Sequence, residues 1–136
     1  MLTARAEAVF STTCSGIAAG MSFDNALASV PVRDVDTAAE WYARLLDRPP
    51  SRPMDEVAEW KFDGGGGLQV YQAPERAGGG SVTLVVTEVE RHADALRALG
   101  VDADVGGSER VKTVMVKDPD GNSIALAEAG DPELLR

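Results

Sequence analysis

The residue types that most often carry enzyme chemistry are scarce in this chain. Its 136 residues include one cysteine, Cys14, and one histidine, His92. A structural zinc site needs several cysteine or histidine ligands, and a disulfide framework needs paired cysteines. A Ser-His-Asp or Cys-His catalytic set needs a histidine beside its nucleophile, and His92 falls in a helical pattern with no placed partner. We therefore predict that Cys14 is incidental and that His92 is a solvated helix residue.

Two short motifs resemble ligand-binding loops but lack their key residues. The stretch D-x-D-G-N at 118–122 is similar to the start of a calcium loop, yet Ser123 and Ala129 stand where that loop needs glycine and glutamate. A turn explains this stretch better, because its aspartate and asparagine side chains can bond nearby backbone amides. The glycine run at 64–67 lacks the Gly-Lys-Ser/Thr of a phosphate loop and is interpreted as a strand connection. We predict no cofactor.

Composition and charge argue against several classes of function. The formal net charge is −9, with 22 acidic residues against 13 lysines and arginines. Nucleic-acid binding depends on clustered basic residues, and those of this chain are scattered. No run approaches the roughly 18 apolar residues that span a bilayer. We predict a cytoplasmic protein that binds neither nucleic acid nor membrane, and a composition rich in Ala, Gly, Val and Arg points to a bacterial source.

The patterned sequence occupies one domain. Residues 1–21 lack a convincing signal-peptide core and are predicted to be a disordered N-terminal extension. Residues 22–130 form the predicted domain, with modules at about 24–75 and 81–129, and residues 131–136 form a C-terminal tail. A chain of this length buries roughly two thirds of its unfolded surface, so a core without disulfides is possible.

The two modules follow the same pattern. Apolar side chains alternate over residues 26–33, which indicates a strand, and recur at helical spacing over 34–46 behind an N-capping aspartate. Residues 81–100 repeat this strand and helix. Each helix is followed by a short strand, near 52–55 and 102–105, and then by a strand, a turn and a strand. Each module therefore has the order βαβββ.

This order predicts an α+β fold in which two mixed sheets are paired and enclose a concave cavity. A single helix can cover only one face of each sheet, so the opposite faces are left to line a common concavity. The residues assigned to the helix-covered faces are Val30, Val32, Leu68 and Val70 in the first module and Leu84, Val86, Ile124 and Leu126 in the second.

The candidate ligand-binding residues are those whose side chains lie on the strand faces opposite the helices. We expect Trp60, Tyr71 and Met115 to supply aromatic and apolar contacts. Four polar residues would orient a ligand: Ser29, Gln69, Ser81 and Thr83. The alternative is that these side chains simply fill the concavity. The acidic residues Asp55, Glu56 and Glu59 could form a rim for a cationic molecule, although solvated surface charge is the commoner explanation.

The two βαβββ modules, the helix entry VRDVDTAAEWYARLL and the exit DPDGNSIALAE together resemble the vicinal oxygen chelate superfamily. This superfamily includes glyoxalase I, extradiol dioxygenases and bleomycin-resistance proteins. The resemblance covers about residues 24–129, which is essentially all of the patterned chain. The resemblance is a strong indicator of the fold and a weak indicator of any one reaction, because one fold hosts many functions.

The resemblance also carries an expectation about metal binding. Metal-dependent members hold their ion on the concave face, with ligands from the first, fourth, fifth and eighth strands. The corresponding positions here are Leu27, Gln69, Ser81 and Ala125, which leave a single amide oxygen from the side chains that normally bind metal. Catalytic metal sites usually keep three or more protein ligands. The resemblance therefore implies that this chain has lost the metal site.

These observations predict a metal-free small-molecule-binding protein of the glyoxalase/bleomycin-resistance type. It is expected to be a homodimer that holds an apolar or aromatic ligand in the sheet cavity. A metal-dependent lyase, isomerase or dioxygenase of the same superfamily is the second hypothesis, and a non-catalytic interaction or regulatory module is the third.

Overall fold

The structure, a computed structural model, describes residues 21–130. The predicted N-terminal extension, apart from Met21, and the predicted tail at 131–136 lie outside the described residues. Among residues 21–130, no helix is long and apolar enough to cross a membrane.

The first module contains one helix and a four-stranded mixed sheet. Its elements are β2 (Leu27–Val32), α1 (Val35–Leu46), β3 (Ser51–Met54), β4 (Val57–Lys61) and β5 (Gly67–Gln72). The strand order is β2-β5-β4-β3. Strands β2 and β5 are parallel, and the other two pairs are antiparallel.

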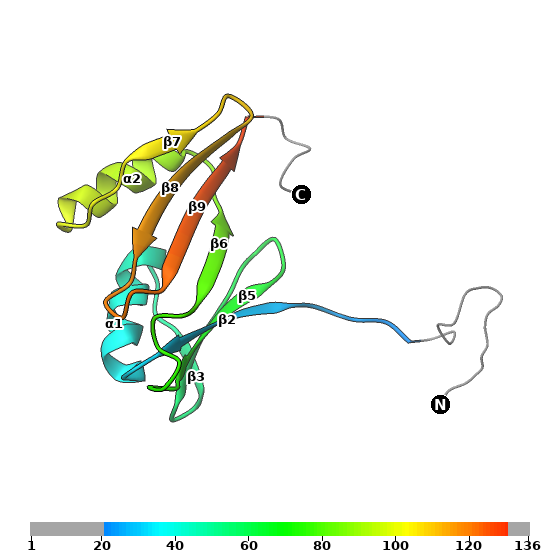
Figure 1. The fold of residues 1–136 in the computed structure, drawn as a ribbon. Coiled ribbons are helices and arrows are strands. Elements are labelled where there is room, and N and C mark those ends of the chain that lie inside the picture. The colour runs from blue at the N-terminus through cyan, green and yellow to red at the C-terminus, as the bar shows by residue number, and fades with distance from the viewer. Residues whose placement is uncertain (1–20, 131–136) are drawn as a thin grey trace.

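The second module repeats this topology. Its elements are β6 (Ser81–Val85), α2 (Val89–Ala98), β7 (Val105–Gly107), β8 (Val111–Lys117) and β9 (Ser123–Ala129), and the strand order is β6-β9-β8-β7. The predicted α+β fold with two βαβββ modules and mixed sheets is confirmed (Figure 1). Strand β7 begins later than predicted, because its pairing with β8 starts at Val105, opposite Val114.

The two helices begin in different ways although their sequences align. The N-cap Asp34 of α1 is extended, and its carboxylate accepts a hydrogen bond from the amide of Asp36 at 3.2 Å. Its counterpart Glu88 adopts a left-handed conformation, with φ 56°, and gives α2 no side-chain cap. The carboxylate of Glu128 on β9 instead accepts a hydrogen bond from the amide of Val89 at 2.7 Å. A carboxylate from a neighbouring strand therefore stabilises the start of α2.

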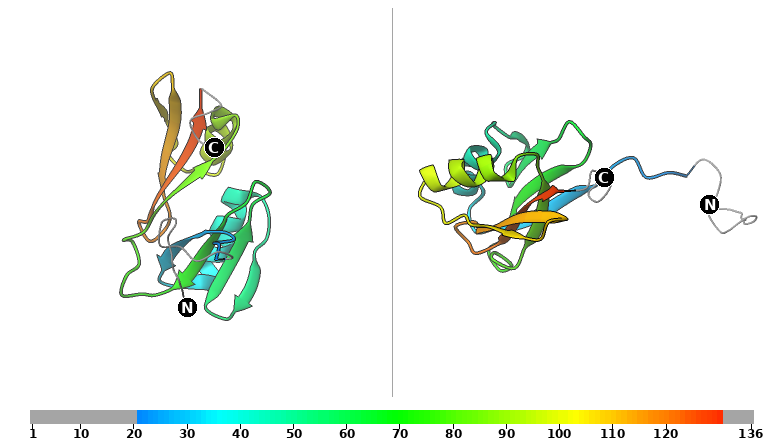
Figure 2. Two further views of the ribbon diagram at one scale, coloured as in Figure 1. Left: turned by 90° about the vertical axis from the view of Figure 1, so that its right-hand side faces the viewer. Right: turned by 90° about the horizontal axis from the view of Figure 1, so that it is seen from above.

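The hydrophobic core lies between each helix and one face of its sheet. Alternate residues of β2, β5, β6 and β9 are buried there, as the alternation predicts. The two helices lie on the same side of the molecule (Figure 1). Figure 2 shows the two modules as separate lobes, which leaves the second face of each sheet for other contacts.

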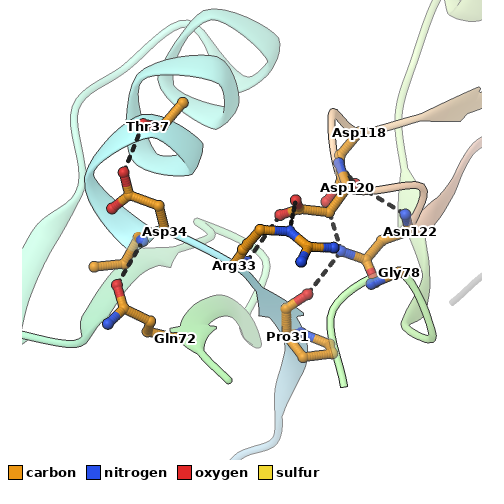
Figure 3. A network of polar contacts seen from close by, with 10 residues as sticks. Pro31, Arg33, Asp34, Thr37, Gln72, Gly78, Asp118, Asp120 and Asn122 are labelled. Carbon is orange, nitrogen blue, oxygen red and sulfur yellow. Dashed lines mark hydrogen bonds and ion pairs between the residues drawn. The ribbon is translucent and has the colours of Figure 1, made fainter. Parts of the chain in front are cut away.

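A buried polar network joins the two modules. The side chain of Asn122, fully buried in the turn between β8 and β9, donates to the carbonyl of Pro31 on β2 at 2.8 Å. Its amide oxygen accepts hydrogen bonds from the backbone amides of Gly78 and Gly80 in the connection between the modules. The network also includes an ion pair between Arg33 and Asp120 (Figure 3). The turn of the second module is thereby fixed against β2 of the first.

Close packing at this junction requires glycine. A Cβ atom on Gly80 would lie 2.8 Å from the side chain of Pro31 and 2.9 Å from the amide oxygen of Asn122. Gly78 has φ of 94°, a conformation that other residues rarely adopt. The glycine-rich connection at 78–80 therefore sets the distance between the modules.

Candidate functional site

A row of polar side chains crosses the open face of the first sheet, which we call the first concave face. Ser29 on β2, Gln69 on β5 and Glu59 on β4 are direct neighbours in the sheet register. The hydroxyl of Ser29 lies 3.4 Å from the amide oxygen of Gln69, and the amide nitrogen of Gln69 donates to the carboxylate of Glu59 at 3.0 Å. These bonds fix the amide of Gln69 with its oxygen toward Ser29. The row presents a defined polar pattern to any molecule on this face.

An aromatic ring lies beside this row on the same face. Tyr71 is opposite Val57 on β4 and Pro31 on β2, and it is partly exposed. The guanidinium carbon of Arg76 lies 5.5 Å from the centroid of the Tyr71 ring, within cation–π range. The first concave face therefore combines an oriented amide, a carboxylate and an aromatic surface.

The open face of the second sheet, which we call the second concave face, carries an exposed methionine among small and polar side chains. Ala125 on β9 is paired with Thr83 on β6 and with Met115 on β8, so these three residues share one side. Ser81, two residues before Thr83, lies on the same side and is exposed. Met115 is the large apolar side chain of this face and is 59% exposed. Small side chains around a methionine leave room for a flat apolar group.

Six of the seven candidate ligand-binding residues lie on these two faces. Ser29, Gln69 and Tyr71 are on the first, and Ser81, Thr83 and Met115 are on the second. Ser29 and Gln69 are in direct contact, whereas Thr83 and Met115 flank Ala125 from opposite sides. Their role in binding stays a prediction.

The sequence-based prediction that Trp60 lies on the concave face is wrong. Trp60 is paired with Leu68, which faces α1, and it is 2% exposed. Its indole nitrogen donates to the carbonyl of Arg48 at 2.9 Å, and its ring lies 6.1 Å from that of Tyr42. Alternation within β4 allows either face, and only the register of the β4–β5 hairpin decides between them. Trp60 is therefore a core residue.

The same register reveals a residue that the sequence left among the surface charges. Glu59 precedes Trp60, so burial of the tryptophan against α1 directs the glutamate to the first concave face. Its carboxylate meets Gln69 there. The available signal was the strand parity, once the large aromatic residue is assigned to the core.

The positions that bind metal in metal-dependent relatives do not fit a divalent ion here. The register places Leu27 and Gln69 on the first concave face and Ser81 and Ala125 on the second. Gln69 offers one amide oxygen, and the adjacent Glu59 adds one carboxylate. Within the described residues no three His, Cys, Asp or Glu side chains gather closely enough to hold a metal. This donor set is short of the three or more ligands of a catalytic metal centre.

Comparison with known proteins places the chain in a family. The model of the glyoxalase-like domain matches residues 27–127. A solved structure of a glyoxalase / bleomycin resistance protein from Catenulispora acidiphila DSM 44928 is 32% identical, with a TM-score of 0.69, over 77% of this chain and 97% of that one. Comparison with curated proteins finds no match.

Two further solved structures share the fold at lower identity. TnmS3, an antibiotic binding protein from Streptomyces sp. CB03234, is 24% identical with a TM-score of 0.69, over 80% of this chain and 98% of that one. Oxidase ChaP-H2 is 13% identical with a TM-score of 0.67, over 82% of this chain and 100% of that one. The fold alone thus accommodates both a binding protein and an enzyme. The domain match and the Catenulispora relative show that this chain belongs to the glyoxalase-like family of the vicinal oxygen chelate superfamily.

Proposed function

We propose that the protein is a metal-free binding protein that holds an apolar or aromatic small molecule between its concave faces. The observation that carries this proposal is the combination on the first concave face of an oriented amide, Gln69, with the partly exposed ring of Tyr71. Binding sites are commonly apolar surfaces with a few fixed polar groups. The ring would stack on a flat ligand, and Ser29 and Gln69 would orient its polar edge.

The second concave face would supply the opposite wall. Met115 is 59% exposed, and Val85 on the same sheet is also 59% exposed. Two exposed apolar side chains on an open sheet face gain stability when they are covered. A homodimer, in which a second copy of the chain lies across the mouth of the cavity, would close it and exclude water from the ligand.

Relatives support a small-molecule role and leave the ligand open. The antibiotic binding protein TnmS3 has the same fold. Antibiotics with an aromatic ring that could stack on Tyr71 are therefore the first ligand class to test. The acidic Glu59 beside Gln69 would favour a molecule with a hydrogen-bond donor or a positive charge at its polar edge.

The test is a screen of flat aromatic compounds, with and without a basic group, scored by thermal shift and then by titration. A binding compound should lose about tenfold or more in affinity in Tyr71→Ala and in Gln69→Leu. Leu99→Ala is the matched control, because Leu99 is 54% exposed and lies at the end of α2, away from both concave faces. A hit that is equally weakened by Leu99→Ala would contradict the proposed site.

A metal-dependent enzyme of the same family is the competing function. Glu59 and Gln69 would be its first two ligands, once the amide of Gln69 turns its oxygen from Ser29 toward Glu59. A stoichiometric divalent ion retained after dialysis, and lost in Glu59→Gln, would replace the binding proposal with this one. An interaction module instead predicts a stable dimer whose concave faces bind no compound in the screen.

A further inference from the structure

A groove on the helix side of the molecule has the composition of a second binding site. It has a volume of about 730 Å³ and lies between the C-terminal end of α1, the exit of β6 and the first turns of α2. None of the six residues predicted for the concave faces lines it. Its volume falls within the range of small-molecule sites, roughly 300–1,000 Å³. The groove is therefore large enough for a ligand of its own.

The floor of the groove is apolar. Leu84 and Leu126 belong to the core beneath α2, and Leu45, Leu46 and Phe62 are partly buried around it. Val85 adds an exposed side chain at the edge. An aromatic or alicyclic ligand placed here would cover apolar surface that is now in contact with water.

The rim of the groove is basic in a chain that is acidic as a whole. Arg44, Arg48 and Arg91 line it with His92, against two acidic residues, Asp47 and Glu88. The whole chain carries a formal charge of −9, with only 13 lysines and arginines. The three arginines therefore make this groove basic, whereas the chain as a whole is acidic. At physiological salt distant charges are screened, so the nearby guanidinium groups decide what binds.

These arginines keep donors free for a ligand. Among the described residues, Arg44 and Arg48 form no ion pair, and Arg91 pairs with Glu88 at 3.4 Å through two largely exposed side chains. Arg48 is held over the Phe62 ring at 5.6 Å and donates to the carbonyl of Lys61. A guanidinium group has five N–H donors, so these contacts leave several unused.

The backbone amides at the start of α2 would not be the donors for an anion in this groove. The amide of Val89 is already bonded to the carboxylate of Glu128, and the amides of Arg91 and His92 are bonded to the carbonyl of Glu88. Recognition of an anion would therefore rest on arginine side chains, which bind carboxylate, sulfonate and phosphate groups with paired hydrogen bonds.

The geometry points to a second site in this groove for an organic anion, a molecule with an apolar body and a carboxylate or similar group. The body would lie on Leu45, Leu46 and Phe62, whose side chains are partly exposed in the groove. The anionic group would be held by Arg44 and Arg91. Apart from Val85, which lies at the edge of the groove and on the second concave face, this site uses no residue of the concave faces, and it does not depend on the function proposed for them.

The probe is 2-naphthoate, an aromatic carboxylate that matches both parts of the groove. Titration of the full chain should shift the backbone amide resonances of Thr87, Glu88, Arg91 and His92. The double variant Arg44→Gln/Arg91→Gln should weaken binding by about tenfold or more, because two charge-assisted contacts are lost. Two control ligands separate the contributions: neutral 2-naphthalenemethanol and inorganic phosphate should each bind at least about tenfold more weakly than 2-naphthoate.

Matched variants keep the result specific. Arg97→Gln removes an arginine from the same helix, where it pairs with Asp94 at 2.8 Å away from the groove, and should leave the affinity unchanged. Tyr71→Ala should also leave it unchanged, since that residue belongs to the first concave face. Equal weakening by Arg97→Gln, equal affinity for the neutral analogue, or resonance shifts confined to the concave faces would overturn the proposal. Circular dichroism of each variant confirms that the fold is retained.

Discussion

The hydroxyl of Tyr42 on α1 donates a hydrogen bond of 2.7 Å to the carboxylate of Asp118, which is 76 residues away in the sequence. Tyr42 belongs to the first module and Asp118 to the turn of the second. Asp118 is 4% exposed and also accepts bonds from the backbone amides of Asp120 and Asn122. A buried carboxylate needs hydrogen-bond donors to replace the water contacts that it loses on burial. This bond therefore joins the two modules at a site that water hardly reaches.

Tyr42→Phe should lower the free energy of unfolding by about 1–3 kcal/mol, because it removes one donor from a buried carboxylate. Chemical denaturation with urea measures the change. Tyr71→Phe is the matched control: the structure assigns its hydroxyl no partner among the described residues, so a loss below about 0.5 kcal/mol is expected. Similar losses in both variants would mean that the bond to Asp118 contributes little.

The stability of the wild-type protein should fall at high pH through the same tyrosine. Burial first, and then the hydrogen bond to Asp118, raise the pKa of Tyr42 above its ordinary value of 10.0. The folded chain therefore holds this phenolic proton more tightly than the unfolded chain. The resulting stabilisation is complete below a pH of about 10 and is lost as the pH rises further, by at most about 1.4 kcal/mol per pH unit.

Urea denaturation between about pH 8 and pH 11 tests this dependence. The difference between the wild type and Tyr42→Phe isolates the contribution of Tyr42, because the other titrating groups are common to both. The difference should shrink as the pH rises. A constant difference across this range would show that Tyr42 does not titrate differently in the folded and unfolded chains.

Substitution of Asn122 should be more damaging than that of Tyr42. Its side chain makes four hydrogen bonds, to Gly78, Gly80, Pro31 and Asp118. Asn122→Ala leaves one buried carbonyl and two partly buried backbone amides without these partners and should cost about 3 kcal/mol or more. Asn122→Asp should cost still more at neutral pH, because it places a second carboxylate against Asp118, and mild acid should reduce that extra loss. Asn25→Ala, at an exposed asparagine, is the control in the same denaturation series.

Trp60→Phe separates a core role from a binding role. The substitution removes the hydrogen bond to Arg48 and part of the contact with Tyr42, so the melting temperature should fall. The affinity for any compound found in the screen should change by less than about threefold, since Trp60 faces α1. A large loss of affinity with unchanged stability would show that Trp60 contacts the ligand.

Metal retention is the remaining test. The protein is incubated separately with nickel, zinc, manganese and iron salts, dialysed, and examined by elemental analysis. We expect far less than one ion per chain, because Leu27 and Ala125 carry no ligand atom. One retained ion per chain would show that ligands other than the four family positions form a site.

Local sequence determined most of the elements of this protein. The alternation in residues 26–33 and 81–86 predicts two strands, and the structure has them at Leu27–Val32 and Ser81–Val85. The turn at 118–122 was also correctly predicted, since Asp118 accepts bonds from backbone amides within that turn. These features depend on contacts between residues close in sequence, which short patterns of residue types encode.

The tertiary structure decided which faces and partners those elements acquired. The pairing of β4 with β5 turned Trp60 into the core and Glu59 onto the first concave face, a choice that alternation within β4 leaves open. Only the packing of the modules brought Asn122 to Pro31 and Tyr42 to Asp118. The spacing of apolar and polar residues along the chain predicts which side chains are buried, but not which distant group each of them contacts. That information arises when the chain folds and every buried polar group must find a partner.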